Sequence, residues 1–131
     1  MKKMFLLFSH KLTQIQKDDA VATFGIDEFV YLPKNLQEVF SNVPSNLDRL
    51  NNYLEDIKKY LKENSSKDDI VLIQGDFGAT FILVNFAKSL SLKPVYATTK
   101  RVVQEYLEED KFIKKSIFEH ERFREYELGV V

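Results

Sequence analysis

Unbroken apolar runs recur along the first 97 residues, and each predicts a strand. Residues 4–8 (Met-Phe-Leu-Leu-Phe) and 70–73 (Ile-Val-Leu-Ile) contain no polar position, which is typical of strands covered on both faces of a parallel sheet. Shorter runs at 28–32 and 95–97 predict a second and a fourth strand. The pattern therefore indicates four strands with helical or polar stretches between them.

Two helices are predicted in the first third of the chain. Thr13 and Gln16 have the spacing of a capping box, and Gly25 is placed to end a helix. We therefore expect a helix that follows the first strand and ends near Phe24. Its weak apolar stripe consists of Ile15, Val21, Ala22 and Phe24. A shorter helix is expected over residues 35–42.

The clearest helical pattern begins after Pro44. Ser45 and Asp48 have the spacing of a cap, and apolar residues then recur at intervals of three and four. These residues are Leu47, Leu50, Leu54, Ile57 and Leu61. Residues 81–90 are apolar on nearly every side, so we expect a buried helix there. Strands that alternate with helices favour an α/β fold with a doubly wound, mostly parallel sheet, in a single domain of residues 1–131.

The C-terminal stretch 102–128 permits two interpretations. The apolar residues between Val102 and Leu107 fit a helix, whereas the residues after Asp110 alternate between apolar and polar. We favour a β-hairpin that turns near residues 109–111 and adds an antiparallel edge to the sheet.

Composition and charge limit the classes of protein to which this fold can belong. The hydrophobic fraction is 44% with 11 Phe and 6 Tyr, which excludes a disordered chain. The absence of Cys excludes a disulfide framework and fits a reducing compartment. The apolar start at 4–8 is too short for a signal peptide or a membrane span. A formal net charge of −1 gives no overall field for long nucleic acid. We expect a cytoplasmic protein that contacts neither a membrane nor long nucleic acid.

The strand-to-helix turn at residues 74–80 (Gln-Gly-Asp-Phe-Gly-Ala-Thr) is the candidate anion site. Gly75 and Gly78 let the backbone bend and approach a ligand closely, and the following helix directs free N–H groups to the same place. The turn has no Gly-Lys-Ser/Thr and lacks the three glycines of a dinucleotide loop, so nucleoside triphosphates and NAD are poor candidates.

Polar residues follow three of the predicted strands, and the ends of parallel strands meet at one edge of a sheet. The groups are Ser9 and His10, then Gly75, Asp76, Phe77, Gly78, Ala79 and Thr80, then Thr98, Thr99, Lys100 and Arg101. Hydroxyls, amides and cations in one crevice suit a ligand that carries phosphate. No carboxylates or histidines are spaced as metal ligands, so we expect no metal.

Each of these residues also has a purely structural interpretation. Asp76 fits a helix cap, and His10 fits an ordinary exposed histidine. Thr98 and Thr99 fit strand or cap positions, and Arg101 fits a solvated surface charge. His120 lies among acidic and basic residues that fit cross-strand charge pairs.

Five stretches of the sequence carry a resemblance to a known family. They are residues 5–13 (Phe-Leu-Leu-Phe-Ser-His-Lys-Leu-Thr), 40–44 (Phe-Ser-Asn-Val-Pro), 74–80, 96–101 (Tyr-Ala-Thr-Thr-Lys-Arg) and 118–126 (Phe-Glu-His-Glu-Arg-Phe-Arg-Glu-Tyr). Together they resemble the small, stand-alone CRISPR-associated ring nucleases that occur beside type III systems. The turn at 75–80 and the Ala-Thr-Thr at 97–99 are the most specific.

This resemblance implies a Rossmann-like (CARF-like) domain that forms a homodimer and binds cyclic oligoadenylate second messengers in a crevice at the dimer interface. It also implies that the ring is cut without a metal or another cofactor, which would switch off type III CRISPR signalling. The ribose 2′-hydroxyl attacks the adjacent phosphorus in line and leaves a 2′,3′-cyclic phosphate. Cyclic tetra-adenylate is the first expectation for the ring.

Placement in the predicted crevice assigns roles to individual residues. His10 is expected to be the general acid or base, and Asp76 is the rival base or orients the ribose. The scissile phosphate is expected to be held by Ser9, Thr80, Thr98 and Arg101, with backbone contacts from Gly75, Gly78 and Ala79. Thr99 is a further ligand-binding candidate, and the adenines are expected to stack on Phe77 or a tyrosine. The main alternative is a protein that captures the ring without cutting it. A third interpretation is a flavodoxin-like interaction domain in which the turn is only structural.

Overall fold

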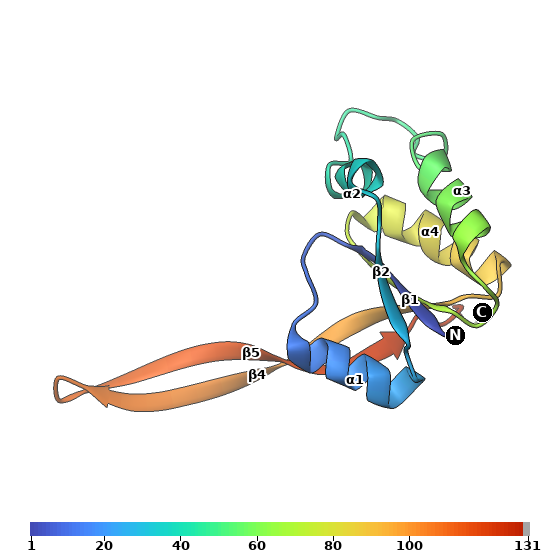
Figure 1. Cartoon of the computed structure of the whole chain (residues 1–131). Helices are drawn as coiled ribbons and strands as arrows, with labels where there is room; N and C mark the ends of the chain where they lie inside the picture. The colour runs from blue at the N-terminus through green and yellow to red at the C-terminus, as the bar shows by residue number, and fades with distance from the viewer. Residues whose placement is uncertain (130–131) are drawn as a thin grey trace.

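A computed structural model describes residues 1–129 as a mixed α/β fold, with a five-stranded sheet flanked by helices (Figure 1). The strand order is β2-β1-β3-β4-β5. The strands are β1 (Lys3–Phe8), β2 (Glu28–Tyr31), β3 (Ile70–Gln74), β4 (Lys93–Glu108) and β5 (Lys111–Glu125). The first four in this order run parallel, and β5 is antiparallel to β4. The predicted positions of β1, β2 and β3 are confirmed to within one residue.

Four helices cover the two faces of the sheet. They are α1 (Gln14–Phe24), α2 (Lys34–Ser41), α3 (Glu55–Asn64) and α4 (Phe77–Ser89). One face lies under α1, and the other lies under α2, α3 and α4 (Figure 1). Successive residues of β1 pack on opposite faces of the sheet. Met4 and Leu6 pack on the α1 side, whereas Phe5 and Leu7 pack on the α2–α4 side. This explains why β1 has no polar position in its centre.

The predicted first helix is confirmed, with both signals at its ends. The Thr13 hydroxyl accepts from the Gln16 amide at 3.2 Å, and the Gln16 side chain accepts from the Thr13 amide at 2.9 Å. Gly25 ends the helix with a φ of 68°. The predicted apolar stripe is wrong in part, because Ile15 and Val21 are exposed and Ala20 is the buried residue of this helix.

The predicted long helix after Pro44 is wrong over its first ten residues, because α3 begins only at Glu55. Ser45 and Asp48 therefore do not cap it. The preceding segment forms turns. The Tyr53 hydroxyl donates hydrogen bonds to the carbonyls of Val39, at 2.5 Å, and of Asn42, and these bonds fix the segment to the end of α2. Leu50 and Leu54 reach the core from these turns rather than from a regular helix, whereas Leu47 is exposed.

The predicted helix that contains residues 81–90 is confirmed as α4, but it is not buried all round. It starts at Phe77, directly after its cap Asp76. Its inner side packs through Ala79, Leu83 and Ala87, whereas Phe77 and Phe81 are exposed. The inner stripe of this apolar helix is fully covered, Ile82, Val84 and Phe86 are half-buried, and the outer side is exposed.

The predicted C-terminal hairpin is confirmed, but its first strand is far longer than the predicted 95–97. β4 pairs with β3 only through Lys93–Val95 and with β5 as far as Glu108. The two-residue turn is Glu109 and Asp110, with φ values of 50° and 63°, which suit the twist of a tight hairpin. Beyond its base the hairpin projects away from the rest of the chain (Figure 1). We call residues 99–120 the arm.

Candidate functional site

The carboxyl ends of β1 and β3 lie side by side, and two of the three predicted polar groups leave the sheet there. Phe8 is paired in register with Gln74. Ser9 and His10 follow the first of these residues, and the turn at 75–80 follows the second. The structure therefore brings these two groups to neighbouring positions at one edge of the sheet.

At the end of β1, hydrogen bonds from α2 fix the backbone beside the exposed Ser9 and His10. The Gln37 side-chain amide donates to the Phe8 carbonyl at 2.8 Å and to the Ser41 hydroxyl at 3.0 Å, and Ser41 shares a hydrogen bond of 3.0 Å with Ser9. The His10 ring lies edge-on to Phe8, with 5.3 Å between ring centres.

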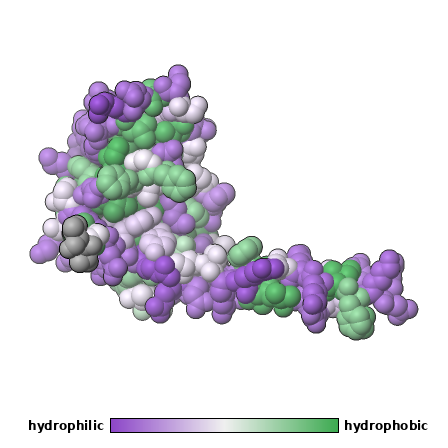
Figure 2. Space-filling model, turned by 180° about the vertical axis from the view of Figure 1, so that it is seen from behind, coloured by the Kyte–Doolittle hydropathy of each residue, from purple (hydrophilic) through white to green (hydrophobic). Residues whose placement is uncertain are grey.

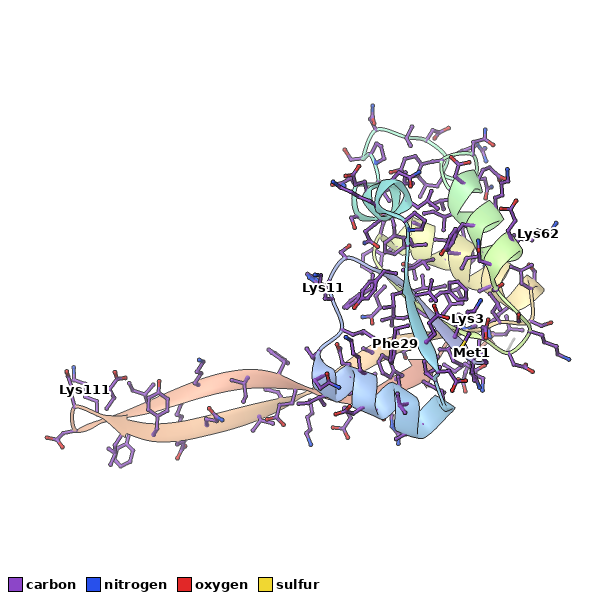
Figure 3. All side chains as sticks on the ribbon, in the orientation of Figure 1. Met1, Lys3, Lys11, Phe29, Lys62 and Lys111 are labelled. Carbon is purple, nitrogen blue, oxygen red and sulfur yellow. The ribbon has the colours of Figure 1, made fainter. Side chains whose placement is uncertain are left out.

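These residues border a cavity of about 400 Å³ between β1, β2 and α2. Two lysines line it, Lys11 and Lys34, together with His10 and Tyr31. Lys11 lies on the loop after β1 and reaches outward (Figure 3). This arrangement can attract an anion, because two lysines face one acidic residue, Glu38, in the lining.

At the end of β3, Asp76 is the N-cap of α4. Its Oδ2 accepts from the Ala79 amide at 3.0 Å, and its backbone carbonyl accepts from the Thr80 amide at 2.8 Å. The structural interpretation of Asp76 is thus confirmed, and one carboxylate oxygen is committed to the cap. Phe77 and Gly78 provide the remaining amides at this helix end, where a helix has no internal acceptors for its N–H groups.

The two glycines of the turn have a packing reason that the sequence did not indicate. A Cβ at Gly75 would lie 2.7 Å from Cζ of Phe40, which is 2% exposed. A Cβ at Gly78 would lie 3.3 Å from a methyl of Leu50. Neither glycine has a positive φ, because the positive-φ glycine of residues 1–129 is Gly25. The absence of a side chain at Gly75 therefore makes room for Phe40.

An aromatic cavity of about 390 Å³ adjoins this turn, lined by Gln74, Gly75, Phe77, Thr80, Tyr96 and Tyr126. The Tyr96 and Tyr126 rings are 4.7 Å apart, and the Arg124 guanidinium lies 5.5 Å from the Tyr96 ring centre. Phe77 is 95% exposed. The Thr80 Oγ1 is buried without a hydrogen-bond partner within residues 1–129. The cavity thus offers aromatic faces to a ligand, and a buried hydroxyl without a partner lies in its wall.

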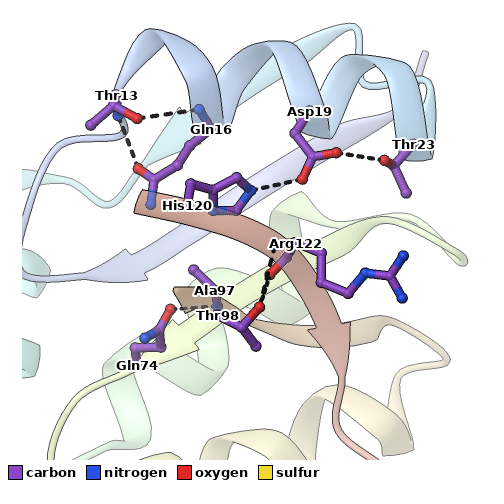
Figure 4. A network of polar contacts seen from close by, with 9 residues as sticks. All are labelled: Thr13, Gln16, Asp19, Thr23, Gln74, Ala97, Thr98, His120 and Arg122. Atoms are coloured by element: carbon purple, nitrogen blue, oxygen red, sulfur yellow. Dashed lines mark hydrogen bonds and ion pairs between the residues drawn. The ribbon is translucent and has the colours of Figure 1, made fainter. Parts of the chain in front are cut away.

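Tyr126 and Gln74 hold the walls of this cavity together. The Tyr126 hydroxyl donates to the Ile73 carbonyl at 2.7 Å, and burial, with a smaller effect of Tyr96, raises the pKa of Tyr126. The Gln74 side chain accepts from the Ala97 amide at 2.7 Å, just beyond the last pair of β3 and β4 (Figure 4). Sequence reasoning assigned no role to Tyr126, because its place beside β3 depends on the hairpin.

The third predicted group does not lie at the end of a strand. Thr98, Thr99 and Arg101 are inside β4, which continues for several more residues. The Thr98 hydroxyl donates to the Arg122 carbonyl at 2.9 Å (Figure 4). The Arg101 guanidinium donates to the Ser116 hydroxyl at 2.8 and 3.0 Å on the arm. The prediction that all three polar groups meet at one edge of the sheet is therefore wrong for residues 98–101, because β4 extends past them into the arm.

His120 makes a partly buried contact that the sequence gave no sign of. Its Nε2 lies 2.7 Å from Oδ2 of Asp19 on α1, and its side chain is 6% exposed (Figure 4). Burial raises the pKa of Asp19, but hydrogen bonds from His120 and Thr23 and nearby positive charge outweigh it and lower the pKa overall. This pair ties the base of the arm to α1, whereas the sequence suggested cross-strand charge pairs.

Residues 1–129 contain no group of three or more His, Cys, Asp or Glu residues that could hold a metal ion. No helix in this range is long and apolar enough to cross a membrane.

Comparison with known proteins places the chain in a family. A curated relative, "Uncharacterized protein MJ1673" of Methanocaldococcus jannaschii, is 52% identical over 126 residues, which cover 96% of this chain and 98% of the relative. No solved structure matches the chain. The model of the "Uncharacterized protein MJ1673 family" matches residues 2–124. The chain belongs to the Uncharacterized protein MJ1673 family.

Proposed function

We propose that this protein binds cyclic oligoadenylates at the carboxyl edge of β1 and β3 and cuts them, as the resemblance to ring nucleases implies. The observation that carries the proposal is the pairing of Phe8 with Gln74. It sets the loop with Ser9 and His10 beside the turn that begins α4. The two loops lead to a cationic cavity and an aromatic cavity, which match the phosphates and the bases of such a ligand.

The phosphate groups would be held on both sides of this edge. Lys11, Lys34 and the Ser9 hydroxyl offer positive charge and a donor beside β1. The amides of Phe77 and Gly78, at the positive end of the α4 dipole, offer donors beside β3. Gly75 would provide backbone rather than side-chain surface to the ligand, whereas Ala79 is buried and its amide donates to Asp76.

The adenines would stack on the aromatic residues of the second cavity. Phe77 is almost fully exposed, which is costly for a side chain with no ligand or partner. Tyr96 and Tyr126 form a ready platform, and stacking on such residues contributes about 1 to 3 kcal/mol per base. Thr80, whose hydroxyl has no partner within residues 1–129, would bind the base or the ribose. A volume of about 390 Å³ fits one nucleoside unit of a larger ring.

The chemistry needs alignment and proton transfer rather than a metal. The ribose 2′-hydroxyl loses its proton and bonds to phosphorus, the bond from phosphorus to the 5′-oxygen breaks, and the 5′-oxygen gains a proton. His10, exposed at the end of β1, is the proposed acid or base. Asp76, with the oxygen that the cap leaves free, would orient the ribose. Thr98 and Thr99 would contact the ligand near Tyr96, whereas Arg101 is engaged by Ser116.

The same proposal includes a Rossmann-like homodimer in the cytoplasm that ends type III CRISPR signalling. A ring with an even number of units has two-fold symmetry, and a two-fold dimer presents the same edge to each half.

One observation favours a second function, capture of the ring without cleavage. His10 and Asp76 are the proposed catalytic pair, but His10 lines the cationic cavity whereas Asp76 lines neither cavity and already caps α4. A protein in which these groups do not meet the same phosphate would bind and sequester the messenger.

The deciding experiment uses labelled cyclic tri-, tetra- and hexa-adenylate with the pure protein in excess chelator, followed by chromatography of the products. We expect linear products with a 2′,3′-cyclic phosphate, and loss of cutting with retained binding in His10→Ala. Gln14→Ala, an exposed change on α1, is the control and should cut at the wild-type rate. Intact rings that remain bound would favour capture, and no binding of any ring would refute both functions.

A further inference from the structure

The arm exposes apolar side chains that the rest of the chain does not cover. Val103 is 53% exposed, Leu107 64%, Phe112 81% and Phe118 71%. Figure 2 shows apolar groups spaced along the projecting hairpin. Of the helices that the structure describes, none lies against the outer part of the arm (Figure 1). The exposure is therefore a property of the arm and not of a single loop residue.

These four side chains share one face of the arm. Leu107 is paired directly with Phe112, and Arg101 with Phe118, so each pair points to one side. Positions 101, 103 and 107 of β4 also point to that side, because side chains alternate along a strand. We call the surface formed by Val103, Leu107, Phe112 and Phe118 the Phe112 face.

The opposite face of the arm is apolar as well. Val102 is paired with Ile117 and Tyr106 with Ile113, and three of these four side chains are half-buried against one another. A two-stranded ribbon is marginally stable in water without further packing. The arm therefore needs a surface to cover at least one of its faces.

The body of the same chain carries an apolar surface that is also uncovered. Phe77 is 95% exposed, Phe81 71% and Leu128 69%. With Val84 and Tyr126 they border a cavity of about 300 Å³ beside α4. We call Phe77, Phe81 and Leu128 the α4 patch. Because the arm points away from the body, it cannot reach its own α4 patch (Figure 1).

We propose that two copies of this chain exchange arms, so that the Phe112 face of each copy packs on the α4 patch of the other. In such a dimer, related by a two-fold axis, the Phe112 face and the α4 patch of both copies are covered. No uncovered copy of either surface remains, so the assembly is closed and does not grow into a filament. The proposal gives a structural means for the homodimer suggested above, and it does not depend on any ring ligand.

The area involved matches that of a stable dimer. The seven exposed side chains of the Phe112 face and the α4 patch present roughly 750 to 1,000 Å² per copy, taking about 150 to 200 Å² for a fully exposed apolar side chain. Specific dimers bury about 800 Å² per partner. The apolar side chains alone thus reach the size of a specific interface.

Charge also favours a second copy over nucleic acid. Between residues 99 and 120, five basic residues (Lys100, Arg101, Lys111, Lys114 and Lys115) balance five acidic ones (Glu105, Glu108, Glu109, Asp110 and Glu119). Such an arm is not repelled by a chain whose net charge is −1. It lacks the basic stripe that a nucleic-acid surface requires.

Exchange would place the arm of one copy beside the aromatic cavity of the other. Phe77 borders both the cavity beside α4 and the aromatic cavity at the end of β3. An arm on the α4 patch would therefore form part of the wall of the partner's crevice, and the site would be complete only in the dimer.

Light scattering of purified full-length protein, without any ligand, tests the exchange. The arm variant is Leu107→Glu with Phe112→Lys, whose opposite charges remain paired across the hairpin. The body variant is Phe81→Glu. The control is Ile15→Glu, which changes a similarly exposed apolar residue, 68% exposed, on α1.

We expect wild type and control to have twice the mass of the 15.4 kDa chain, and the arm and body variants each to have the mass of one chain. Mixing the arm and body variants should restore dimers, because the mixed pair keeps one unaltered arm on one unaltered α4 patch. A monomeric wild type, or a body variant that stays dimeric, would overturn the proposal. A dimer that neither binds nor cuts rings would leave the exchange standing and refute only the ring function.

Discussion

Replacing Gly75 with alanine tests why this turn contains a glycine. The added Cβ would lie 2.7 Å from Cζ and 2.8 Å from Cε2 of Phe40, whereas carbon atoms pack at about 3.5 to 4.0 Å. Phe40 is 2% exposed and packs in the core between α2 and the sheet, so its ring has little room to move. Overpacking of this kind costs about 1 to 3 kcal/mol.

The measurement is the free energy of unfolding from urea titration, and Gly78→Ala is the matched control. At Gly78 the new methyl would meet the end of the Leu50 side chain at 3.3 Å and Oδ2 of Asp76 at 3.4 Å, which is an ordinary contact distance. Alanine also favours helix over glycine by up to about 1 kcal/mol. We therefore expect Gly78→Ala to be neutral or stabilising, and Gly75→Ala to lower stability by about 1 to 3 kcal/mol.

A double-mutant cycle with Phe40→Leu gives the stricter test. The shorter side chain removes the ring atoms that the alanine would meet, so the cost of Gly75→Ala should fall by about 1 kcal/mol or more in that background. An unchanged stability of Gly75→Ala in the wild-type background, or the same cost in both backgrounds, would refute this explanation. Loss of ligand binding with intact stability would instead support the view that the glycine serves the ligand.

Two titratable groups give predictions about pH. Asp19→Asn should lower stability at neutral pH by about 1 to 3 kcal/mol, because it weakens the contact with the buried His120. The pKa of Asp19 is lower in the folded state, so its contribution to stability is present above the ordinary pKa of 3.8 and is lost as pH falls through the folded value. The stabilities of variant and wild type should therefore converge in acid. The pKa of Tyr126 is raised, so its contribution is present below pH 10.0 and is lost as pH rises through the folded value. Tyr126→Phe should therefore be less stable at neutral pH, through loss of the bond to the Ile73 carbonyl, and should lose less stability in alkali, as followed by circular dichroism.

Local signals in the sequence predicted the elements that depend on local physics. The cap formed by Thr13 and Gln16 lies within four residues, and the apolar β1 and β3 reflect burial on two faces. The start of α3 was missed because the leucines before Glu55 have helical spacing, yet Tyr53 bonds to the end of α2 and holds that segment in turns.

The candidate site was predictable only in part, because its remaining contacts join distant segments. The two loops after β1 and β3 follow from parallel strand pairing. By contrast, the packing of Phe40 over Gly75, the pair of Asp19 and His120, and the place of Tyr126 beside β3 depend on the packed fold. The length of β4 was missed because its outer residues are mostly exposed and charged. Such a stretch fits a surface helix or loop as well as a strand until the pairing with β5 is known.

Calorimetric titration of the purified protein with cyclic tetra-adenylate, using His10→Ala to prevent cleavage, tests the central claim most directly. The proposed function predicts saturable binding of one ring for every two chains, with affinity lost in Phe77→Ala and kept in Gln14→Ala. The absence of binding by this ring and by the tri- and hexa-adenylate rings, or binding of one ring per chain, would contradict a shared site at the edge of β1 and β3.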